Sequence, residues 1–300
     1  MADTTSQPSL SIHTQAQERP SFFTAAQTRK YLSYIILTMG AIISLVPFLW
    51  MIFKSVMSLG ESMSSAFIPT EINLENYLQA WQIGNFSEYF INSILITVIT
   101  LAGELIFSIL AAYAFARIDF PGKNVIFAML LATLMIPVMV TTIPNLLIVT
   151  WLGRVGPFSW VNNWPALTIP FMGSIFSIFL LRQFFIQIPD ELYDAARIDG
   201  AGHLRFLAQV VVPLSKAPLM VIVVLSFIGS WNSLAWPLLV TNSPEWRPIA
   251  VGLMNFVDEA GQQVNLMMAG AFITIIPILI MYFFTQKQFT ESISRSGIKG

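Results

Sequence analysis

The stretch YFINSILITVITLAGELIFSILAAYAF, residues 89–115, decides the fold class of this chain. Its side chains are mainly apolar, with scattered small polar residues and a single charged one, Glu104. A helix crosses the hydrocarbon core of a bilayer with roughly 20 mainly apolar residues. This stretch therefore predicts a membrane-spanning helix, and it places an acid deep inside that helix.

Five further stretches have the same apolar character. Hydrophobic residues make up 55% of the chain and charged residues 10%, whereas soluble domains carry about 25% charged residues. Pro137 and Pro144 predict a kink in the third span. We therefore expect an all-α polytopic membrane protein with six transmembrane helices, the other five at residues 31–53, 125–151, 164–181, 217–240 and 266–284.

Lysine and arginine are distributed unevenly between the predicted loops, which indicates the orientation. With the amino terminus inside the cell, twelve basic residues are cytoplasmic and three are external. We therefore expect both termini in the cytoplasm: a flexible tail (residues 1–30), a six-helix domain (31–287) and a second tail (288–300). The external residues are Lys54, Arg154 and Arg247; the cytoplasmic ones are Arg19, Arg29, Lys30, Arg117, Lys123, Arg182, Arg197, Arg205, Lys216, Lys287, Arg295 and Lys299.

The residue inventory argues against several kinds of chemistry. The chain has no cysteine, and only His13 and His203 could supply imidazole, so we expect no metal site and no catalytic residue. No G-x-x-x-x-G-K-[ST] phosphate-binding loop occurs, so we expect no ATP site in this chain. The net charge of −1 gives no indication of nucleic-acid binding.

The loop before the fifth span reads PDELYDAARIDGAGHLRFLAQVVVP, residues 189–213. Pro189 suits the first turn of a helix, and the acids that follow it suit the positive amino end. Gly200 can adopt a left-handed conformation and end this helix, and Asp199 is suited to cap the next one. Taken alone, the loop is equally consistent with an amphipathic connector that lies on the inner membrane surface.

The segment Asp194-Ala195-Ala196-Arg197-Ile198-Asp199-Gly200-Ala201, followed by Pro213, resembles the cytoplasmic "EAA" loop of ABC importer permeases. Other parts of the chain resemble the maltose-type carbohydrate branch of that family. These are Asn76-Tyr77, Asn92-Ser93, Ala112-Tyr113-Ala114-Phe115-Ala116-Arg117, Phe120-Pro121-Gly122-Lys123, Trp231-Asn232, Trp236-Pro237-Leu238 and Gly297-Ile298-Lys299-Gly300.

The resemblance implies the type I importer permease fold, with the 189–213 loop docking onto a separate ATPase. Two departures from the family pattern occur: Asp194 stands where glutamate is usual, and Leu207 where phenylalanine is usual, with Phe206 as the nearest substitute. The docking residues implied by position are Asp194, Ala195, Ala196, Asp199, Gly200, Ala201, Phe206 and Pro213.

The resemblance also implies the partners and the mechanism. It implies a second homologous permease, a cytoplasmic ABC ATPase dimer that binds ATP and Mg²⁺, and an extracytoplasmic solute-binding protein that delivers the sugar. The expected function is carbohydrate translocation by alternating access across the plasma membrane of a bacterium or archaeon, with membrane lipid around the chain. We expect no cofactor bound by this chain itself.

Four residues are candidates for contact with the substrate. Glu104 could accept a hydrogen bond from a sugar hydroxyl, because ionisable groups within a membrane face a cavity or a partner. Its alternative role is structural, as a partner for a polar group of the second permease or for backbone carbonyls. Asn145, Trp231 and Asn232 could likewise contact a sugar, although such residues also serve packing and interhelical hydrogen bonds.

Three alternatives remain open from the sequence. A membrane-embedded enzyme requires paired acids, a serine–base pair or metal ligands, which the chain does not present as a cluster. An ion-coupled secondary transporter predicts inverted repeats and several intramembrane charges. An importer of the same class could carry glycerol phosphate or another solute, although charged cargo favours several charges along the spans, and therefore an uncharged sugar or polyol is preferred.

Overall fold

The computed structural model describes residues 25–156, 159–258 and 261–296. The chain divides into two compact units, residues 1–49 and residues 50–300. The described part of the first unit belongs to helix α1 (Ala25–Ser55), which continues into the second unit.

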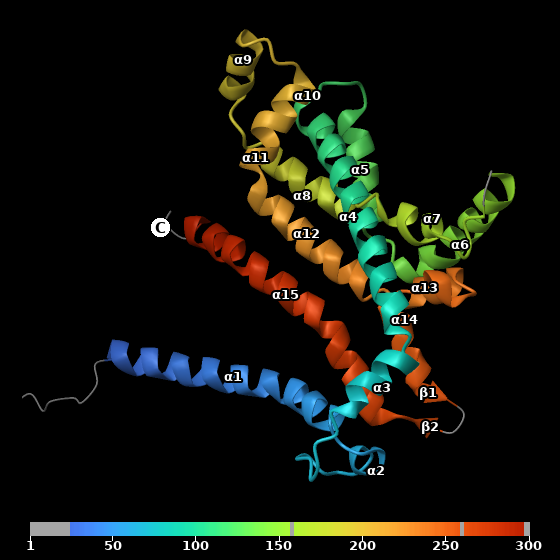
Figure 1. Cartoon of the computed structure of the whole chain (residues 1–300). Coiled ribbons are helices and arrows are strands. Elements are labelled where there is room, and N and C mark those ends of the chain that lie inside the picture. Colours follow the sequence, from blue (N-terminus) through green and yellow to red (C-terminus); the bar gives the residue numbers. More distant parts are fainter. Residues whose placement is uncertain (1–24, 157–158, 259–260, 297–300) are drawn as a thin grey trace, which may run out of the picture. The chain divides into compact units, whose positions relative to one another are not determined.

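The second unit holds all the remaining elements (Figure 1). In chain order they are α2 (Leu59–Ser62), α3 (Glu75–Ile83), α4 (Phe86–Arg117), α5 (Lys123–Thr133), α6 (Val138–Val155), α7 (Trp164–Thr168), η1 (Ile169–Phe171), α8 (Ile175–Phe185), α9 (Asp190–Ile198), α10 (His203–Phe206), the π-helix η2 (Leu207–Val211), α11 (Val212–Leu214), α12 (Lys216–Trp231), α13 (Ala235–Val240), η3 (Pro244–Trp246), α14 (Ile249–Gly252), η4 (Leu253–Phe256), the antiparallel pair β1 (Val257–Asp258) and β2 (Gly261–Gln262), and α15 (Val264–Ser296).

Length and composition allow five of the described helical segments to cross a membrane, or six when the bent pair that ends in α12 is counted as one span. This confirms the membrane class and the six-span prediction. The predicted spans 31–53, 89–115 and 266–284 lie within α1, α4 and α15. These three stretches are long apolar runs, and the helices extend two or more residues beyond each predicted boundary.

The third predicted span is divided into two helices, α5 and α6. The chain leaves the helical path between Leu134 and Pro137, and Pro137 has an extended ψ of 136° at the start of α6. Pro144, by contrast, is accommodated inside α6. The predicted interruption is therefore confirmed, and it occurs at the first proline because a proline disfavours helical geometry in the residue before it.

The fourth and fifth spans also contain breaks. In the fourth, the helical path is interrupted after η1 and resumes at α8, whose first turn is capped by the Ser174 hydroxyl. The prediction of one helix over residues 217–240 is wrong: α12 ends at Trp231 and α13 is a separate helix. At the other end of α12, the segments His203–Leu214 and Lys216–Trp231 meet at an angle of 80°.

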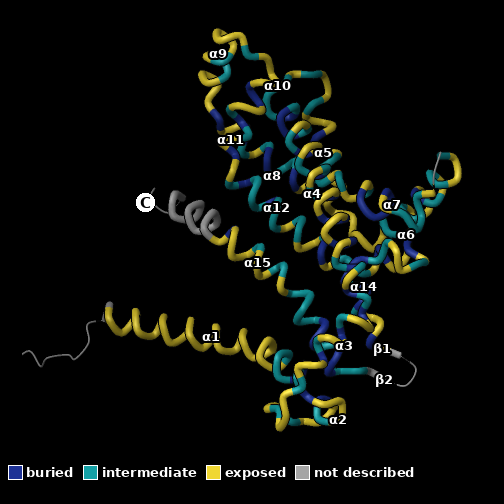
Figure 2. Tube along the Cα trace, viewed as in Figure 1, coloured by how far each residue is buried: buried dark blue, intermediate teal, exposed yellow. Residues whose placement is uncertain are grey.

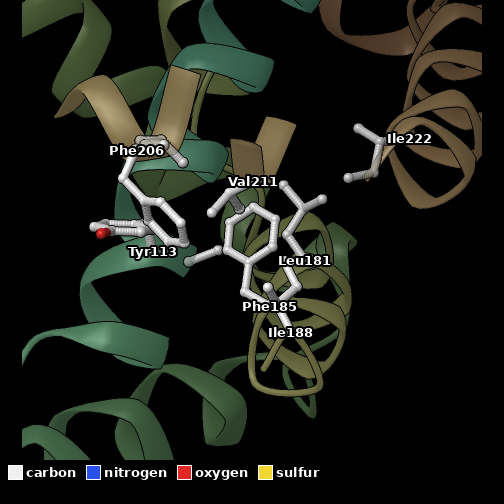
Figure 3. Close-up of a cluster of buried hydrophobic side chains, with 9 residues drawn as sticks. Tyr113, Leu181, Phe185, Ile188, Phe206, Val211 and Ile222 are labelled. Carbon is white, nitrogen blue, oxygen red and sulfur yellow. The ribbon is translucent and has the colours of Figure 1, made fainter. Parts of the chain in front are cut away.

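Helix α4 packs against both α8 and α12, and this group forms the framework for the sites described below (Figure 1). A buried apolar cluster joins the end of α4 to α8, α10, η2 and α12, as Figure 3 shows. Its members are Ala112, Tyr113, Leu181, Phe185, Ile188, Phe206, Leu207, Val211 and Ile222.

Candidate functional site

The segment of residues 189–213, called the α9–α10 loop from here on, folds around Gly200 as its sequence predicts. Gly200 has a φ of +77°, in the left-handed region that glycine adopts without steric cost. The amide of Gly200 donates to the Arg197 carbonyl at 3.0 Å, and the amide of Ala201 donates to the Ala196 carbonyl at 2.8 Å. This pair of bonds is a Schellman motif, which ends α9 and satisfies its last carbonyls.

The expected capping role of Asp199 is wrong. Asp199 lies at the carboxyl end of α9, and Gly202 occupies the capping position before α10, without a side-chain hydrogen bond. The extended ψ of 176° at Gly202 redirects the chain into α10, so the turn is built from backbone geometry.

The outer face of this loop is exposed (Figure 2). Asp194, Ala195 and Asp199 are exposed, whereas Ala196 and Ala201 are half-buried. Two large apolar side chains are also open: Ile198 is 88% exposed and Leu204 is 72% exposed. The structure thus presents an apolar tip with carboxylates beside it, which is a surface suited to docking another protein.

Phe206 faces the other way. It is 1% exposed and packs with Leu207 in the apolar cluster of Figure 3, and its ring lies edge-on to Tyr193. The docking role of Phe206 stays a prediction. The buried ring of Phe206 connects the loop to the ends of α4 and α8 through the apolar cluster. Pro213 lies in α11, directly after the π-helix η2 and before the bend at Ser215. Because proline lacks the amide needed to continue the helical ladder, it is suited to this transition.

A histidine links α4 to both helices of the loop. His203 Nδ1 lies 2.9 Å from the Tyr113 hydroxyl of α4, and His203 Nε2 lies 2.9 Å from the Tyr193 hydroxyl of α9. Its ring also stacks on Tyr193, with centroids 5.0 Å apart. The end of α4 is thereby tied to the loop through one side chain.

Arg117, the last residue of α4, makes the second link. Its guanidinium donates to the backbone carbonyls of Phe185 and Ile188 and pairs with the Asp190 carboxylate at the start of α9. In return, Arg182 of α8 donates to the Phe115 carbonyl of α4 at 3.1 Å. The sequence placed Arg117 in a family motif without indicating this role, since its partners are distant in sequence.

Glu104 is buried, with 6% exposure, and connects three helices. Its Oε1 accepts a hydrogen bond of 2.6 Å from Ser177 of α8, and its Oε2 accepts one of 2.5 Å from Ser226 of α12. Ser177 lies in the first turn of α8, where the helix dipole favours negative charge. Both partners are serine hydroxyls of this chain, a structural role that differs from the two expected alternatives, a polar group of a second permease and backbone carbonyls.

Glu104 also lines a cavity of about 400 Å³ between α4, α8 and α12. The volume lies within the range of roughly 300–1,000 Å³ of small-molecule sites. Its walls contain Phe171 and Trp236, whose rings pack edge to face at 5.7 Å. The remaining polar side chains are hydroxyls, those of Ser93, Thr100, Ser174, Ser177, Ser226, Ser230 and Ser233.

The other three substrate candidates do not line this cavity. Trp231 is 2% exposed, stacks on Phe227 and donates its indole N–H to the Thr274 carbonyl at 2.9 Å. Asn232 is exposed and donates to the Ile228 carbonyl of its own helix. Asn145 is half-buried in α6. Their contact with a substrate stays a prediction. The hydroxyl residues of the cavity could not be predicted from the sequence, because serine and threonine are common in membrane helices.

Among the described residues, no group of three or more histidine, cysteine or acidic side chains is arranged to hold a metal ion. The features that the structure brings together are an exposed loop tied to the spans and a hydroxyl-lined cavity with one carboxylate. Together with the broken apolar helices, they define a multi-pass membrane transport subunit.

Comparison with known proteins identifies the family. The profile of the family described as "binding-protein-dependent transport system inner membrane component" matches residues 104–290. The chain belongs to this family, and it is a component of a transport system. The match begins at Glu104 and includes the whole α9–α10 loop.

Three relatives cover most of the chain. It is 28% identical to the diacetylchitobiose uptake system permease protein NgcG of Streptomyces coelicolor, over 92% of this chain and 91% of the relative. It is 30% identical to the arabinooligosaccharides transport system permease protein AraQ of Halalkalibacterium halodurans, over 91% and 99%. It is 33% identical to the sn-glycerol-3-phosphate transport system permease protein UgpE of Yersinia pestis, over 87% and 94%.

Solved structures show the same fold. A chain of a bacterial ABC transporter that imports the acidic polysaccharide alginate superimposes with a TM-score of 0.77 at 25% identity, covering 89% of this chain and 98% of that one. A chain from the alginate transporter in complex with its pentasaccharide-bound periplasmic protein gives a TM-score of 0.62 at 13% identity, covering 86% and 93%. The ABC importer permease fold is thus confirmed.

Proposed function

We propose that this chain is one of two permease subunits of an ATP-driven importer that carries an uncharged sugar or polyol. The names of two relatives, NgcG and AraQ, specify oligosaccharides as their cargo. The cavity of this chain is lined by hydroxyls, aromatic rings and one carboxylate, which is chemistry that suits a polyhydroxylated ligand.

The observation that carries the proposal is the construction of the α9–α10 loop. A turn at Gly200, closed by two backbone hydrogen bonds, presents the exposed tip, while Arg117 and His203 link the loop to α4 and α8. A partner that pushes on the tip would therefore move the spans. This is the requirement for a motor that drives alternation between outward-facing and inward-facing states of a helix bundle.

The distribution of charge supports a cytoplasmic position for the loop. Arg117, Arg182, Arg197 and Lys216 belong to the helix ends around α9–α11, and basic residues concentrate on the cytoplasmic side of membrane proteins. This orientation puts both termini inside the cell. A cytoplasmic ATPase dimer, which binds ATP and Mg²⁺, would then dock on α9 and α10, and this chain would need no nucleotide site.

A solute-binding protein on the outer side completes the proposed importer. The family description includes dependence on a binding protein, and the alginate transporter was solved with its periplasmic protein. The name of the relative UgpE suggests glycerol phosphate as an alternative cargo. This cargo is less compatible with the cavity, because the described walls of the cavity carry an acid and no basic side chain. An anion would be repelled by the Glu104 carboxylate in a site of low dielectric constant.

Co-purification tests the proposal directly. The tagged chain is extracted in mild detergent, and the proteins that come with it are identified and assayed for ATP hydrolysis. We expect a second permease and an ATPase, with hydrolysis stimulated by a binding protein plus one sugar. If the chain purifies alone and drives uptake that an ionophore abolishes, the importer assignment is wrong and an ion-coupled transporter replaces it.

A pair of glycine variants tests the role of the loop in the same complex. Gly200→Val places a β-branched residue at φ +77°, which costs at least about 1–2 kcal/mol. Gly202→Ala is the matched control, because Gly202 has a φ of −80° and open space around it. We expect Gly200→Val to abolish sugar-stimulated hydrolysis and Gly202→Ala to preserve it. Normal uptake by Gly200→Val would contradict the docking role.

A further inference from the structure

A second cavity lies between the first turns of α4, the helix α7 and the turn η3, and we call it the α4–α7 groove. Its volume is about 390 Å³. It shares only Ile96 with the cavity between α4, α8 and α12. Its described walls consist of apolar side chains of α4, two indole rings and two polar side chains: Asn92, Leu95, Ile96, Ile99, Trp164, Thr168 and Trp246.

The groove opens on the surface of membrane-spanning helices. Leu95 and Trp164 are exposed, and they belong to two segments that are long and apolar enough to cross a membrane. Helix α4 has 32 residues and is about 48 Å long, whereas the hydrocarbon core of a bilayer is about 30 Å thick. A centred α4 therefore places its first six residues or so in the polar interface. Leu95 and Ile99 then lie in the hydrocarbon, where lipid tails reach the groove.

Two indole rings line the groove without using their N–H groups inside the chain. Trp81, Trp231 and Trp236 each donate the indole N–H to a group of this chain. Within the described residues, neither Trp164 nor Trp246 makes such a bond. Tryptophan at a membrane interface buries its ring among lipid chains and directs its N–H to the wet side. The two rings are therefore suited to the boundary between tails and headgroups.

Arg247 adds a positive charge at the rim of the groove. The side-chain amide of Asn92, which lines the groove, donates to the Glu245 carbonyl at 2.8 Å and to the Arg247 carbonyl at 3.2 Å. The Ile249 amide donates to the Ser93 hydroxyl at 2.7 Å, so this segment is fastened to α4 on both sides of Arg247.

The guanidinium of Arg247 makes no hydrogen bond or ion pair with any described residue. Its Nε is buried, so a ligand would meet the terminal amino groups. Arginine binds phosphate through two parallel hydrogen bonds. The carboxylate nearest along the chain, that of Glu245, accepts from the Ser243 hydroxyl at 3.3 Å.

The polar side chains of the walls are already engaged, which argues against a sugar in the groove. Both amide hydrogens of Asn92 are used, and the Thr168 hydroxyl donates to the Trp164 carbonyl at 2.9 Å. The described walls carry no acid. An apolar floor with a cation and indole N–H groups at one end instead matches the two parts of a phospholipid.

We propose that the α4–α7 groove binds one phospholipid from the leaflet at the Phe86 end of α4, which is the outer leaflet in the proposed orientation. An acyl chain lies against Leu95 and Ile99, and Arg247 binds the phosphate. The next residue, Pro248, lines the cavity between α4, α8 and α12. A bound lipid therefore holds a segment that forms part of the wall of that cavity.

Photolabelling in lipid nanodiscs tests the site without any substitution. Two probes carry the same diazirine in the middle of an acyl chain: phosphatidylglycerol, and diacylglycerol, which lacks the phosphate. The labelled residues are mapped, and the ratio of labelling by the two probes cancels differences in depth. We expect this ratio to be at least threefold higher at Leu95, Ile99 and Trp164 than at Ile106, an α4 residue that is 57% exposed and lies outside the groove. Equal ratios would overturn the proposal.

Two pairs of variants separate the acyl part of the site from the phosphate part. Ile99→Trp fills the groove and should lower phospholipid labelling of Leu95 at least threefold, whereas Val98→Trp, at a neighbouring residue that is 57% exposed and outside the groove, should not. Arg247→Gln should abolish the preference for phospholipid over diacylglycerol, whereas Arg154→Gln, at an exposed arginine of α6, should preserve it. Equal effects within either pair would refute that part of the site.

Soluble competitors identify any other occupant. Diacetylchitobiose and inorganic phosphate should leave the labelling of wild-type protein unchanged. Loss of labelling with the sugar would assign the groove to the cargo, and loss with phosphate alone would assign Arg247 to a free anion, so either result would overturn the lipid site. The labelling ratio is measured on the chain as purified, with or without an accompanying ATPase. Failure of the importer assignment would therefore leave this test unaffected.

Discussion

Removal of the Arg117 side chain should loosen the attachment of the α9–α10 loop more than any other single change in the connection. Arg117 is largely buried and donates to two backbone carbonyls, those of Phe185 and Ile188. Hydrogen bonds that involve a charged group contribute roughly 1.5–3 kcal/mol each. The ion pair with Asp190 adds little, roughly 0–1 kcal/mol, because the Asp190 side chain is 88% exposed and screened by water.

Since such contributions are not additive, we expect Arg117→Ala to lower the free energy of local opening by about 2–4 kcal/mol. The assay is amide hydrogen exchange of the assembled complex in lipid nanodiscs, followed over Ile186–Ile188 and the start of α9. A tenfold change in the exchange rate corresponds to about 1.4 kcal/mol in the free energy of opening, so amide exchange in this segment should accelerate roughly thirtyfold or more.

Two control variants make this experiment decisive. Asp190→Asn removes only the exposed ion pair and should accelerate exchange about fivefold at most. Arg117→Lys keeps the charge but loses the forked guanidinium and should give an intermediate rate. If Arg117→Ala exchanges at the wild-type rate, or no faster than Asp190→Asn, then the carbonyl contacts of Arg117 do not hold the loop.

Three further variants test other parts of the structure. Trp231→Phe removes the hydrogen bond to the Thr274 carbonyl and should lower the stability of the complex by about 1 kcal/mol, measured as a lower Tm. A changed KM for the sugar would instead show that Trp231 contacts the cargo. Gly252→Ala brings a Cβ to 2.6 Å from the Gly84 carbonyl oxygen and should destabilise the protein by roughly 1–3 kcal/mol. Gly60→Ala is the control, because Gly60 has open space around it and the change should not affect stability. Equal Tm values for the two variants would contradict this packing. His203→Phe keeps a ring that can stack on Tyr193 but loses both hydrogen bonds to tyrosine hydroxyls. Sugar-stimulated ATP hydrolysis should therefore fall about twofold to tenfold while basal hydrolysis persists, and an unchanged ratio of stimulated to basal hydrolysis would show that His203 does not contribute to coupling.

The sequence predicted the membrane helices better than their interruptions. Residues 89–115 became one continuous helix, α4, whereas residues 217–240 became α12 and α13 with a break after Trp231. Hydropathy measures apolar character along the chain, and a broken helix in a protein interior keeps that character. The break in the fourth span near Gly173 was missed for the same reason, since a single glycine in an apolar run does not specify a break.

The candidate sites show a similar division. The left-handed Gly200 could be predicted, because a turn between two short helices is a local feature with a local sequence pattern. The partners of Glu104 could not be predicted, because Ser177 and Ser226 lie 73 and 122 positions away along the chain. The same holds for Arg117, whose contacts depend on how α8 and α9 meet the end of α4.

Helix α4 is the element that the cavity and the α9–α10 loop share. It runs unbroken for 32 residues and contains no proline, whereas α1, α6 and α15 contain an internal proline and the remaining spans are interrupted by breaks. Thr100 and Arg117 are separated by about 25 Å along its axis, at a rise of 1.5 Å per residue.

A continuous helix transmits a displacement over that length as a rigid body, while a broken helix can absorb the displacement at the break. Because Arg117 and Arg182 tie the end of α4 to the end of α8, a force applied to the loop would move these two helices together. Glu104 would then change its distance from the α12 wall of the cavity, since α12 begins beyond the bend at Ser215. The placement of the carboxylate on α4 and of Ser226 on α12 makes the hydrogen bond between Glu104 and Ser226 the contact that such a movement would alter.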